Sequence, residues 1–309
     1  MSTKQGSWWP VLATNELRQK PLGRMRFGEQ LVFWRNGDQV VCMPDRCPHR
    51  GAALSLGRVN KDTGSIACPF HGLEFAANGH CTRVPVEQNY SIPADFGVAS
   101  YPVEEADGYI WIWRGPEPAG QLPPLPIHPE TADMRYGQAT GIWKAHYTRC
   151  IENVCDFSHL PYVHKTTIGV FKKNWVMDVQ VEDVAGGFRA VLTESGKVAQ
   201  SFEFLYPNRW LLRLNHNVRL GLVFAPINAT HTFVYGRTWH RLAVPGLNPL
   251  MNLATRFSQY MVFREDWPIV ASQTPGDVLQ AVDEKLLPTD APIIAYRKLH
   301  RGYQGVGAQ

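Results

Sequence analysis

Short apolar runs separated by turn-forming residues dominate the first third of the chain. The segments 30–35, 39–44 and 108–114 read QLVFWR, QVVCMP and GYIWIWR, and they are rich in β-branched and aromatic residues. The turn sequence Asn36-Gly37-Asp38 lies between the first two, as in a β-hairpin. This pattern predicts an all-β domain of short antiparallel strands over residues 1–115.

Prolines mark the next boundary. Residues 116–130 contain six prolines, which favour a stiff and extended backbone. We therefore predict a linker over residues 116–130 and a second domain over residues 131–309.

Strand-like and helical patterns follow one another in this second domain. Residues 176–240 alternate apolar and polar positions, which predicts strands. Residues 249–273 have helical periodicity. One apolar face of this helix would be formed by Leu253, Phe257, Tyr260 and Met261. Strands followed by a long helix predict an α+β fold in which helices cover one antiparallel sheet.

Two further helices are predicted on either side of these segments. Residues 149–164 read as helical until Pro161, where we expect the helix to break. Residues 290–302 read DAPIIAYRKLHRG and predict a helix that ends at Gly302.

The composition is that of an ordinary globular protein. Of 309 residues, 44% are hydrophobic and 19% are charged, and the net charge is +4. No long Lys/Arg block exists, so binding to nucleic acid is not indicated. The chain contains neither an apolar run of about 18 residues nor a signal peptide, so we expect no membrane insertion and a cytoplasmic location.

Six cysteines are present. Cys42, Cys81, Cys150 and Cys155 show no regular spacing, and we expect them to be free buried thiols rather than disulfides.

The other two cysteines are paired with histidines. Cys47-x-His49 and Cys68-x-x-His71 are separated by 18 residues. Two thiols and two imidazoles suit a tetrahedral zinc, or a two-iron cluster in which two histidines replace two cysteines on one iron. A zinc finger places both cysteines before both histidines, which is not the order here. Packing in a core is the third interpretation, but the Pro and Gly residues beside each pair favour two tight metal-binding loops.

A second group of possible ligands follows at Asp156, His159 and His164. Asp156 and His159 are three residues apart and would share one face of a helix. A break at Pro161 could then turn both imidazoles toward one ion. Two histidines and one carboxylate with open positions form the facial triad of non-haem Fe(II) enzymes that activate dioxygen. The alternative is that these are ordinary surface or core histidines.

The carboxylate of such a triad can be distant in the sequence. Asp266, late in the helix predicted for residues 249–273, is the preferred candidate. Asp283 and Asp290 are weaker candidates. Glu265 is adjacent, but it would point about 100° away around the helix.

Together these motifs resemble the oxygenase component of the Rieske non-haem iron oxygenases. The matching segments are CPHRGAALSLG, CPFHGLEF and NVCDFSHLPYVH, the last of which has the pattern N-x-x-D-x-x-H-x4-H. The segment EDWPIVASQ is similar to the late helix that carries the third iron ligand. The segments WWPVLATNEL and PIVASQ are most similar to the branch of vanillate O-demethylase, dicamba monooxygenase and pheophorbide a oxygenase.

The resemblance implies a fold, two metal centres and an assembly. The fold is an all-β Rieske domain followed by a helix-grip (START-like) catalytic domain. A [2Fe–2S] cluster is implied on Cys47, His49, Cys68 and His71. A mononuclear Fe(II) is implied on His159, His164 and Asp266. A head-to-tail homotrimer is implied as well, in which the catalytic residue Asp156 joins His71 of one subunit to His159 of the next. Asn153 is expected to orient groups near the iron.

The resemblance also implies a reaction. A ferredoxin or flavin reductase would supply electrons from NAD(P)H, since the chain has no G-x-G-x-x-G fingerprint for binding it. With O2, the protein would hydroxylate or demethylate a small organic substrate, aromatic or polycyclic. One alternative is cis-dihydroxylation or desaturation. The other is a non-enzymatic Rieske electron carrier with a ligand-binding domain.

Residues 176–240 are expected to line the substrate cavity. Asn215, His216, Asn217 and His240 could contribute polar contacts there, although each could equally be a surface group. Trp143 and Trp239 are expected to be core residues.

Overall fold

The computed structural model describes residues 5–87, 89–169, 177–241, 247–281 and 283–305. The chain folds into two compact units, one formed by Trp8–Arg114 and the other by the residues up to Ser7 together with those from Gly115 onwards. None of the helices that the model describes is both long and apolar enough to cross a membrane.

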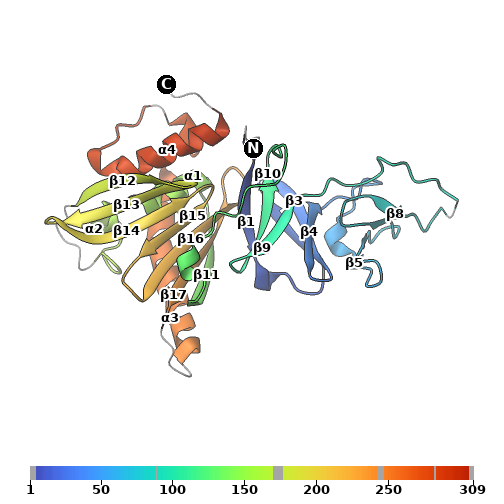
Figure 1. Ribbon diagram of the computed structural model, residues 1–309, viewed down its shortest axis with the longest axis horizontal. Helices are drawn as coiled ribbons and strands as arrows, with labels where there is room; N and C mark the ends of the chain where they lie inside the picture. Colours follow the sequence, from blue (N-terminus) through green and yellow to red (C-terminus); the bar gives the residue numbers. More distant parts are fainter. Residues whose placement is uncertain (1–4, 88, 170–176, 242–246, 282, 306–309) are drawn as a thin grey trace. The chain divides into compact units, whose positions relative to one another are not determined.

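The first unit is built from three small antiparallel sheets, in the orders β1-β10-β9, β2-β3-β4 and β5-β6-β7-β8 (Figure 1). Its strands are β1 (Ser7–Ala13), β2 (Leu22–Arg26), β3 (Glu29–Asn36), β4 (Gln39–Pro44), β5 (Arg58–Val59), β6 (Ile66–Ala67), β7 (Glu74–Phe75), β8 (Cys81–Arg83), β9 (Val103–Ala106) and β10 (Tyr109–Arg114). Two short 3-10 helices, η1 (Thr14–Glu16) and η2 (Leu54–Leu56), connect them. The predicted hairpin of residues 30–44 is confirmed, because β3 and β4 pair through the turn at Gly37, which has φ +59°.

The second unit is one seven-stranded antiparallel sheet with helices on it, in the order β11-β17-β16-β15-β14-β13-β12. Its strands are β11 (Arg135–Trp143), β12 (Asp178–Val184), β13 (Gly187–Glu194), β14 (Lys197–Leu205), β15 (Arg209–Arg213), β16 (Val218–Pro226) and β17 (Thr232–His240). Its helices are α1 (Tyr147–Cys155), α2 (Leu160–Val163), α3 (Leu247–Ser272) and α4 (Ala291–Gln304), with 3-10 turns η3 (Pro129–Thr131), η4 (Val278–Gln280) and η5 (Pro288–Asp290). The α+β class is therefore confirmed.

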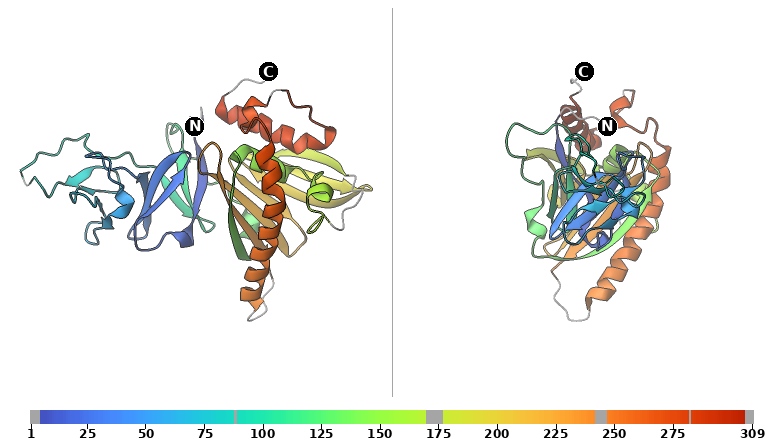
Figure 2. Two further views of the ribbon diagram at one scale, coloured as in Figure 1. Left: turned by 180° about the vertical axis from the view of Figure 1, so that it is seen from behind. Right: turned by 90° about the vertical axis from the view of Figure 1, so that its right-hand side faces the viewer.

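Helices α3 and α4 lie over different parts of the sheet. The long helix α3 packs against β11 and β17, and α4 packs beside β12 and β13 (Figure 2). Aromatic side chains join α4 to the sheet, since Tyr296 lies edge-on to Phe204 with ring centroids 5.3 Å apart. Phe202 and Trp210 continue this aromatic layer along β14 and β15.

Two helix ends differ from the sequence-based predictions. The predicted helix of residues 149–164 is two helices, and the chain leaves α1 at Asp156 rather than at Pro161. Pro161 lies in the first turn of α2, where its missing N–H costs no hydrogen bond. Helix α4 runs through Gly302 and ends at Gly305, whose φ of +67° is left-handed.

The apolar stripe expected on α3 does not face the core. Leu253, Phe257 and Tyr260 are 64%, 67% and 56% exposed. The residues that α3 turns toward the sheet are Thr255, Gln259, Phe263, Asp266 and Val270, all buried. The buried face is more polar than the outer one, so hydrophobic periodicity identified the helix but assigned the wrong face.

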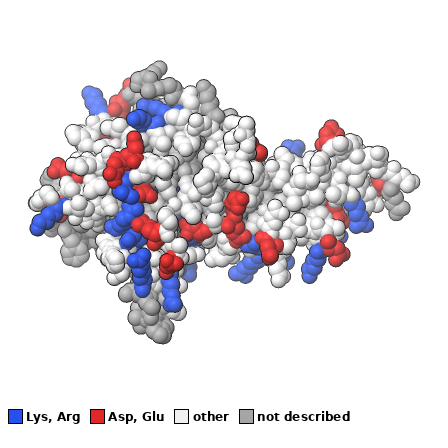
Figure 3. Space-filling view, in the orientation of Figure 1, with Lys and Arg blue, Asp and Glu red and all other residues white. Residues whose placement is uncertain are grey.

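Acidic and basic side chains are intermixed on the visible face of the molecule (Figure 3). In the second unit, Glu203 of β14 pairs with Arg189 at 2.9 Å and Arg213 at 3.3 Å. Arg213 also pairs with Glu130 at 3.0 Å. Partners of opposite sign thus alternate across neighbouring strands.

Candidate metal centres and substrate cavity

Two loops of the first unit repeat the same backbone pattern. In the first loop, the N–H of Cys47 donates to Ala52 and the N–H of Gly51 donates to the carbonyl of Cys47, both at 2.8 Å. In the second, the N–H of Gly72 donates to the carbonyl of Cys68 at 3.0 Å. Gly51 and Gly72 have φ of +76° and +72°, a region in which a side chain is strained. Each loop therefore closes on its own cysteine.

These loops bring the four predicted cluster residues together. The rings of His49 and His71 lie 4.8 Å apart between centroids. Cys47 and Cys68 are 2% and 3% exposed. Burial, with the neighbouring Cys68 thiol adding to it, raises the pKa of Cys47 to about 11. Within the described residues, Nδ1 of His71 is buried and has no hydrogen-bond partner.

This arrangement fits a metal cluster. A buried ring nitrogen without a partner is costly unless it binds something. Thiols become good ligands once they lose their protons to a metal. Two thiols on the inner side and two imidazoles on the outer side match a two-iron cluster with unlike ligands on its two irons.

A buried ionic network fixes helix α1 in the second unit. Glu152 of α1 accepts from Arg149 at 2.8 Å and from Arg297 of α4 at 2.5 Å. Glu284 bonds the same two arginines at 2.6 and 2.5 Å. The charges are paired on both sides, as buried charges require. The network holds α1 against α4, and α1 carries Asn153 to the wall of a cavity.

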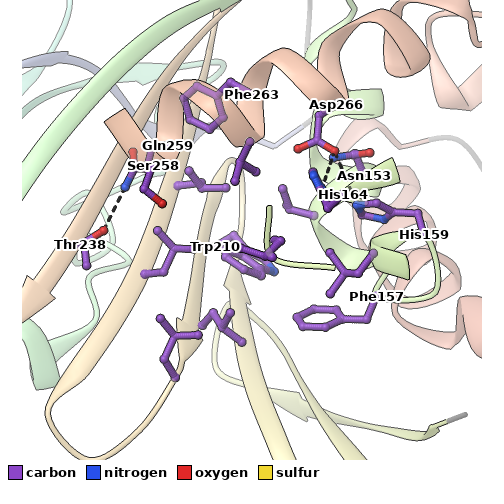
Figure 4. Close-up of a pocket in the computed structure, with 18 of the residues that line it drawn as sticks. Asn153, Phe157, His159, His164, Trp210, Thr238, Ser258, Gln259, Phe263 and Asp266 are labelled. Atoms are coloured by element: carbon purple, nitrogen blue, oxygen red, sulfur yellow. Dashed lines mark hydrogen bonds and ion pairs between the residues drawn. The ribbon is translucent and has the colours of Figure 1, made fainter. Parts of the chain in front are cut away.

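His159 and His164 flank the single turn of helix α2. His159 comes immediately before the turn and His164 immediately after it, with ring centroids 5.3 Å apart. The N–H of His164 donates to the carbonyl of Leu160 at 3.1 Å, which keeps the turn closed. Both imidazoles consequently face the same side (Figure 4).

Asp266 of α3 meets the two histidines. Its Oδ1 lies 3.1 Å from Nε2 of His164 and 3.5 Å from Nε2 of His159. One donor atom from each of the three residues lies within 4.8 Å of the others. Two imidazoles and one carboxylate that converge in this way fit a non-haem Fe(II) site with open positions.

Asp156 lies at Nδ1 of His159, on the side of the ring away from Asp266. Its Oδ2 lies 3.5 Å from Nδ1 of His159, and its Oδ1 accepts from the N–H of Ser158 at 2.6 Å. Asp156 thus reaches His159 around a turn and not along one helix face. Burial alone would lower the pKa of His159, but the carboxylates of Asp156 and Asp266 outweigh it and raise this pKa to about 9.

Glu265 orients His164 through a direct hydrogen bond. Its Oε2 lies 2.8 Å from Nδ1 of His164, on the ring edge opposite Asp266. The hydroxyls of Thr166 and Thr167 donate to Glu265 at 2.5 Å each. From the sequence alone, Glu265 is only a competitor of Asp266 for the iron. Its direction around α3 instead brings it to the far nitrogen of the same imidazole.

The three converging residues lie at one end of a cavity of about 460 Å³. The cavity lies between α3 and the sheet, as predicted for residues 176–240, and Trp210, Leu212 and Leu222 line it. Asn153 also lines it. Trp143, expected only to fill the core, is 1% exposed and contributes to the wall.

Several expected polar contacts lie elsewhere. Asn215, His216 and Asn217 are exposed at the β15–β16 turn, and His240 is buried at the end of β17. The polar residues that do line the far end of the cavity include Thr238, Ser258 and Gln259. No motif marks these three residues. For Gln259, the signal that could have found it is the polar face of α3 that turns inward.

Comparisons with known proteins agree with both units. Residues 7–102 match the Rieske [2Fe-2S] domain family, and residues 143–206 match the vanillate O-demethylase oxygenase C-terminal domain family. The oxygenase subunit of vanillate O-demethylase from Pseudomonas sp. (strain HR199 / DSM 7063) is 36% identical over 169 residues, which are 53% of this chain and 46% of that protein. The oxygenase component of dicamba O-demethylase from Stenotrophomonas maltophilia is also 36% identical, over 53% of this chain and 49% of that protein. The match therefore spans about half the length of these two curated relatives.

Other similarities extend over nearly the whole chain. Methylxanthine N1-demethylase NdmA from Pseudomonas putida is 29% identical over 94% of this chain and 86% of that protein. The structure of Pseudomonas putida CBB5 NdmA with caffeine has a TM-score of 0.80 at 28% identity, covering 95% of this chain and 89% of that one. Dicamba monooxygenase bound to dicamba shares the fold, with a TM-score of 0.77 at 23% identity and coverage of 96% and 97%.

Proposed function

The chain belongs to the Rieske non-haem iron oxygenases, and we propose that it is the oxygenase component of a multicomponent monooxygenase acting on a small organic molecule. The observation that carries this proposal is the convergence of His159, His164 and Asp266 at one end of an apolar cavity. A pure electron carrier needs no second metal centre opening on a cavity.

We assign the ligands as follows. Cys47, His49, Cys68 and His71 would hold the [2Fe–2S] cluster. His159, His164 and Asp266 would hold the mononuclear Fe(II). When bound, the iron supplies the activation of dioxygen, and the cluster supplies the single electrons that this chemistry consumes.

Carboxylates beside the two histidines set the orientation of their rings. Glu265 accepts the Nδ1 proton of His164, which leaves Nε2 unprotonated and directed toward Asp266. Oδ2 of Asp156 faces Nδ1 of His159 at 3.5 Å, an ion-pair distance, and Nδ1 has no hydrogen-bond partner among the described residues. The apolar walls exclude water and place a C–H bond of the substrate beside these residues.

The reaction is a monooxygenation. A methyl ether, one dioxygen, two electrons and two protons give the hydroxylated methyl carbon and one water. The resulting hemiacetal breaks its C–O bond and yields an alcohol and formaldehyde. Demethylase relatives support this outcome over cis-dihydroxylation.

Partners and assembly belong to the same proposal. A ferredoxin or flavin reductase would deliver electrons from NAD(P)H. A homotrimer would bring His71 of one subunit to Asp156 of the next, and the Asp156 side chain is 25% exposed and able to receive it. Cys42, Cys81, Cys150 and Cys155, which are not assigned to the cluster, form no disulfide, in keeping with a cytoplasmic location.

Iron analysis and a single-turnover assay test the function. We expect about three irons per chain, two in the cluster and one mononuclear, and an anisotropic Rieske EPR signal after anaerobic reduction. Exposing the reduced protein to O2 with 6-methoxy-2-acetylnaphthalene should release formaldehyde. Two irons per chain and no formaldehyde would establish the electron-carrier alternative.

A further inference from the structure

The cavity places all of its charged lining residues at one end. Asp156 and Asp266 lie there with His159 and His164. Among the described residues that line the cavity, none is Lys or Arg. A ligand carboxylate in the remaining volume would be buried against aliphatic and aromatic side chains without a cation, which is strongly unfavourable.

The opposite end carries uncharged hydrogen-bonding groups. Gln259 of α3 is 6% exposed, and its Nε2 donates to Oγ1 of Thr238 on β17 at 3.1 Å (Figure 4). Gly236 makes room for this amide, because a Cβ there would lie 1.9 Å from Oε1 of Gln259. Ser258 lines the same end.

A hydroxyl at this polar end can still donate a hydrogen bond to a ligand. Within the described residues, Oε1 of Gln259 accepts no hydrogen bond, but it is enclosed against Gly236 and has almost no surface open to the cavity. The Thr238 oxygen accepts from Gln259, so its own O–H hydrogen remains available to donate. The hydroxyls of Thr238 and Ser258, which line the cavity, are therefore the groups expected to hydrogen-bond a ligand there.

The two ends are separated by a defined distance. Gln259 and Asp266 are seven residues apart on α3, which is two turns and about 10 Å of rise on one face. Phe263 lies between them on the same buried face, and Trp210 and Leu222 face the gap from the sheet. A fused bicyclic or tricyclic skeleton bridges such a gap, whereas one benzene ring does not.

We propose that the substrate is an electrically neutral, elongated ring compound whose carbonyl or hydroxyl oxygen is held at Thr238 and Ser258, with Gln259 positioning Thr238, remote from the carbon that reacts. This inference rests on the proposed function, since it takes the end at Asp266 as the reacting end. The polar end then sets the orientation of the substrate and selects against acids of the same shape.

Equilibrium dialysis with three matched probes tests the proposal without any turnover. The probes are 6-methoxy-2-acetylnaphthalene, which is neutral, 6-methoxy-2-naphthoic acid, which is anionic at pH 7.5, and 2-methoxynaphthalene, which lacks the distal oxygen. With the iron-loaded protein, the ketone should bind at least about tenfold more tightly than the acid. Equal or tighter binding of the acid would overturn the proposal.

Two variants locate the contact. Thr238→Val should weaken binding of the ketone about tenfold, as for one lost hydrogen bond, and leave binding of 2-methoxynaphthalene within about twofold. Ser258→Ala removes a hydroxyl from a more exposed position and should act in the same direction with little risk to folding. The matched control is Thr230→Val, in the β16–β17 turn away from the cavity, which should bind all three probes as the wild type does.

Binding and turnover separate the two proposals. If both variants bind the ketone and 2-methoxynaphthalene equally weakly compared with the wild type, the assigned polar contact is wrong. Tight ketone binding by a protein that holds only two irons per chain and releases no formaldehyde after reduction would overturn the proposed function and leave the ligand class standing.

Discussion

The two candidate metal centres hold their ligands by different means. The loops around Cys47 and Cys68 are shaped by backbone hydrogen bonds and by Gly51 and Gly72 at positive φ. The centre in the second unit depends on side chains instead, since a carboxylate stands behind each histidine. In the first centre, the backbone of two short loops fixes the positions of the ligands. In the second, residues from distant segments can bind one ion, and the cavity beside them leaves room for a substrate.

Each centre is therefore sensitive to substitution at a different kind of position. In the first unit, the shape of a loop decides whether the ligands converge. In the second, the carboxylates Asp156 and Glu265 decide how the imidazoles are presented, while the fold would persist without them.

The largest effect should follow from His159→Ala. We expect the variant to lose the mononuclear iron and all detectable turnover and to keep the red-brown Rieske spectrum, because the two centres share no ligand. Iron content and visible absorption measure both. His216→Ala, on an exposed turn, is the control and should retain about three irons per chain. Loss of the Rieske spectrum in His159→Ala would contradict the ligand assignment.

Asp156→Ala should come next. We expect both centres to stay loaded and turnover to fall about 100-fold, since a carboxylate behind a metal-bound histidine typically contributes that much. Reductase-coupled formaldehyde release measures the loss. Asp183→Ala, at the exposed end of β12, is the matched control. Turnover at the wild-type rate would refute the role of Asp156 between His71 and His159.

Glu265→Gln should have a smaller effect on a different quantity. The amide accepts the Nδ1 proton of His164 less well than the carboxylate does, so Fe(II) affinity should fall about tenfold. Competition with a fluorescent chelator gives the dissociation constant. Glu182→Gln, whose side chain is 58% exposed, should leave this constant unchanged. An unchanged constant in Glu265→Gln itself would remove Glu265 from the site.

The smallest effect concerns Glu74, a buried carboxylate on β7, the strand that follows the second cluster loop. Glu74 accepts from Ser65 at 2.8 Å, Asn60 at 3.0 Å and Arg83 at 3.1 Å. Burial alone would raise the pKa of Glu74, but these donors lower it below its ordinary value. Such a group stabilises the fold above its unfolded-state pKa, and this contribution is lost as the pH falls through the folded-state pKa.

Glu74→Gln should therefore cost about 1–3 kcal/mol of unfolding free energy at pH 7, and the gap to wild type should narrow as the pH falls below 4.5. Thermal melts from pH 7 to pH 3.5 measure it, with the exposed Glu87→Gln as control. A gap that widens in acid would mean that the pKa shift has the opposite sign.

The sequence was informative where the structure is local. The cluster loops lie within 25 residues, from Cys47 to His71, and each loop closes on its own cysteine. Asp266 could be selected because a long helix was evident and its neighbour Glu265 points elsewhere. The hydrogen bond between Glu265 and His164 could not be predicted from the sequence, since it depends on how α3 and α2 are placed in space.

The cavity-lining residues of α3 could not be predicted from the sequence for a related reason. Hydrophobic periodicity on α3 follows Leu253, Phe257 and Tyr260, which are exposed. The inward face contains Gln259 and Asp266 because it borders a cavity rather than a packed core. A helix that serves a site violates the pattern by which helices are oriented from sequence.

The single turn of α2 between His159 and His164 also limits how the chain length can vary. One residue added within Leu160–Val163 would rotate His164 by about 100° around the helix and move it away from Asp266. Within the 18 residues between His49 and Cys68, the exposed turn at Lys61-Asp62-Thr63 has no such constraint, since extra residues there could loop outward. Insertions should therefore be tolerated at this turn and fatal within α2, a rule that directly guides the transplantation of this site into other scaffolds.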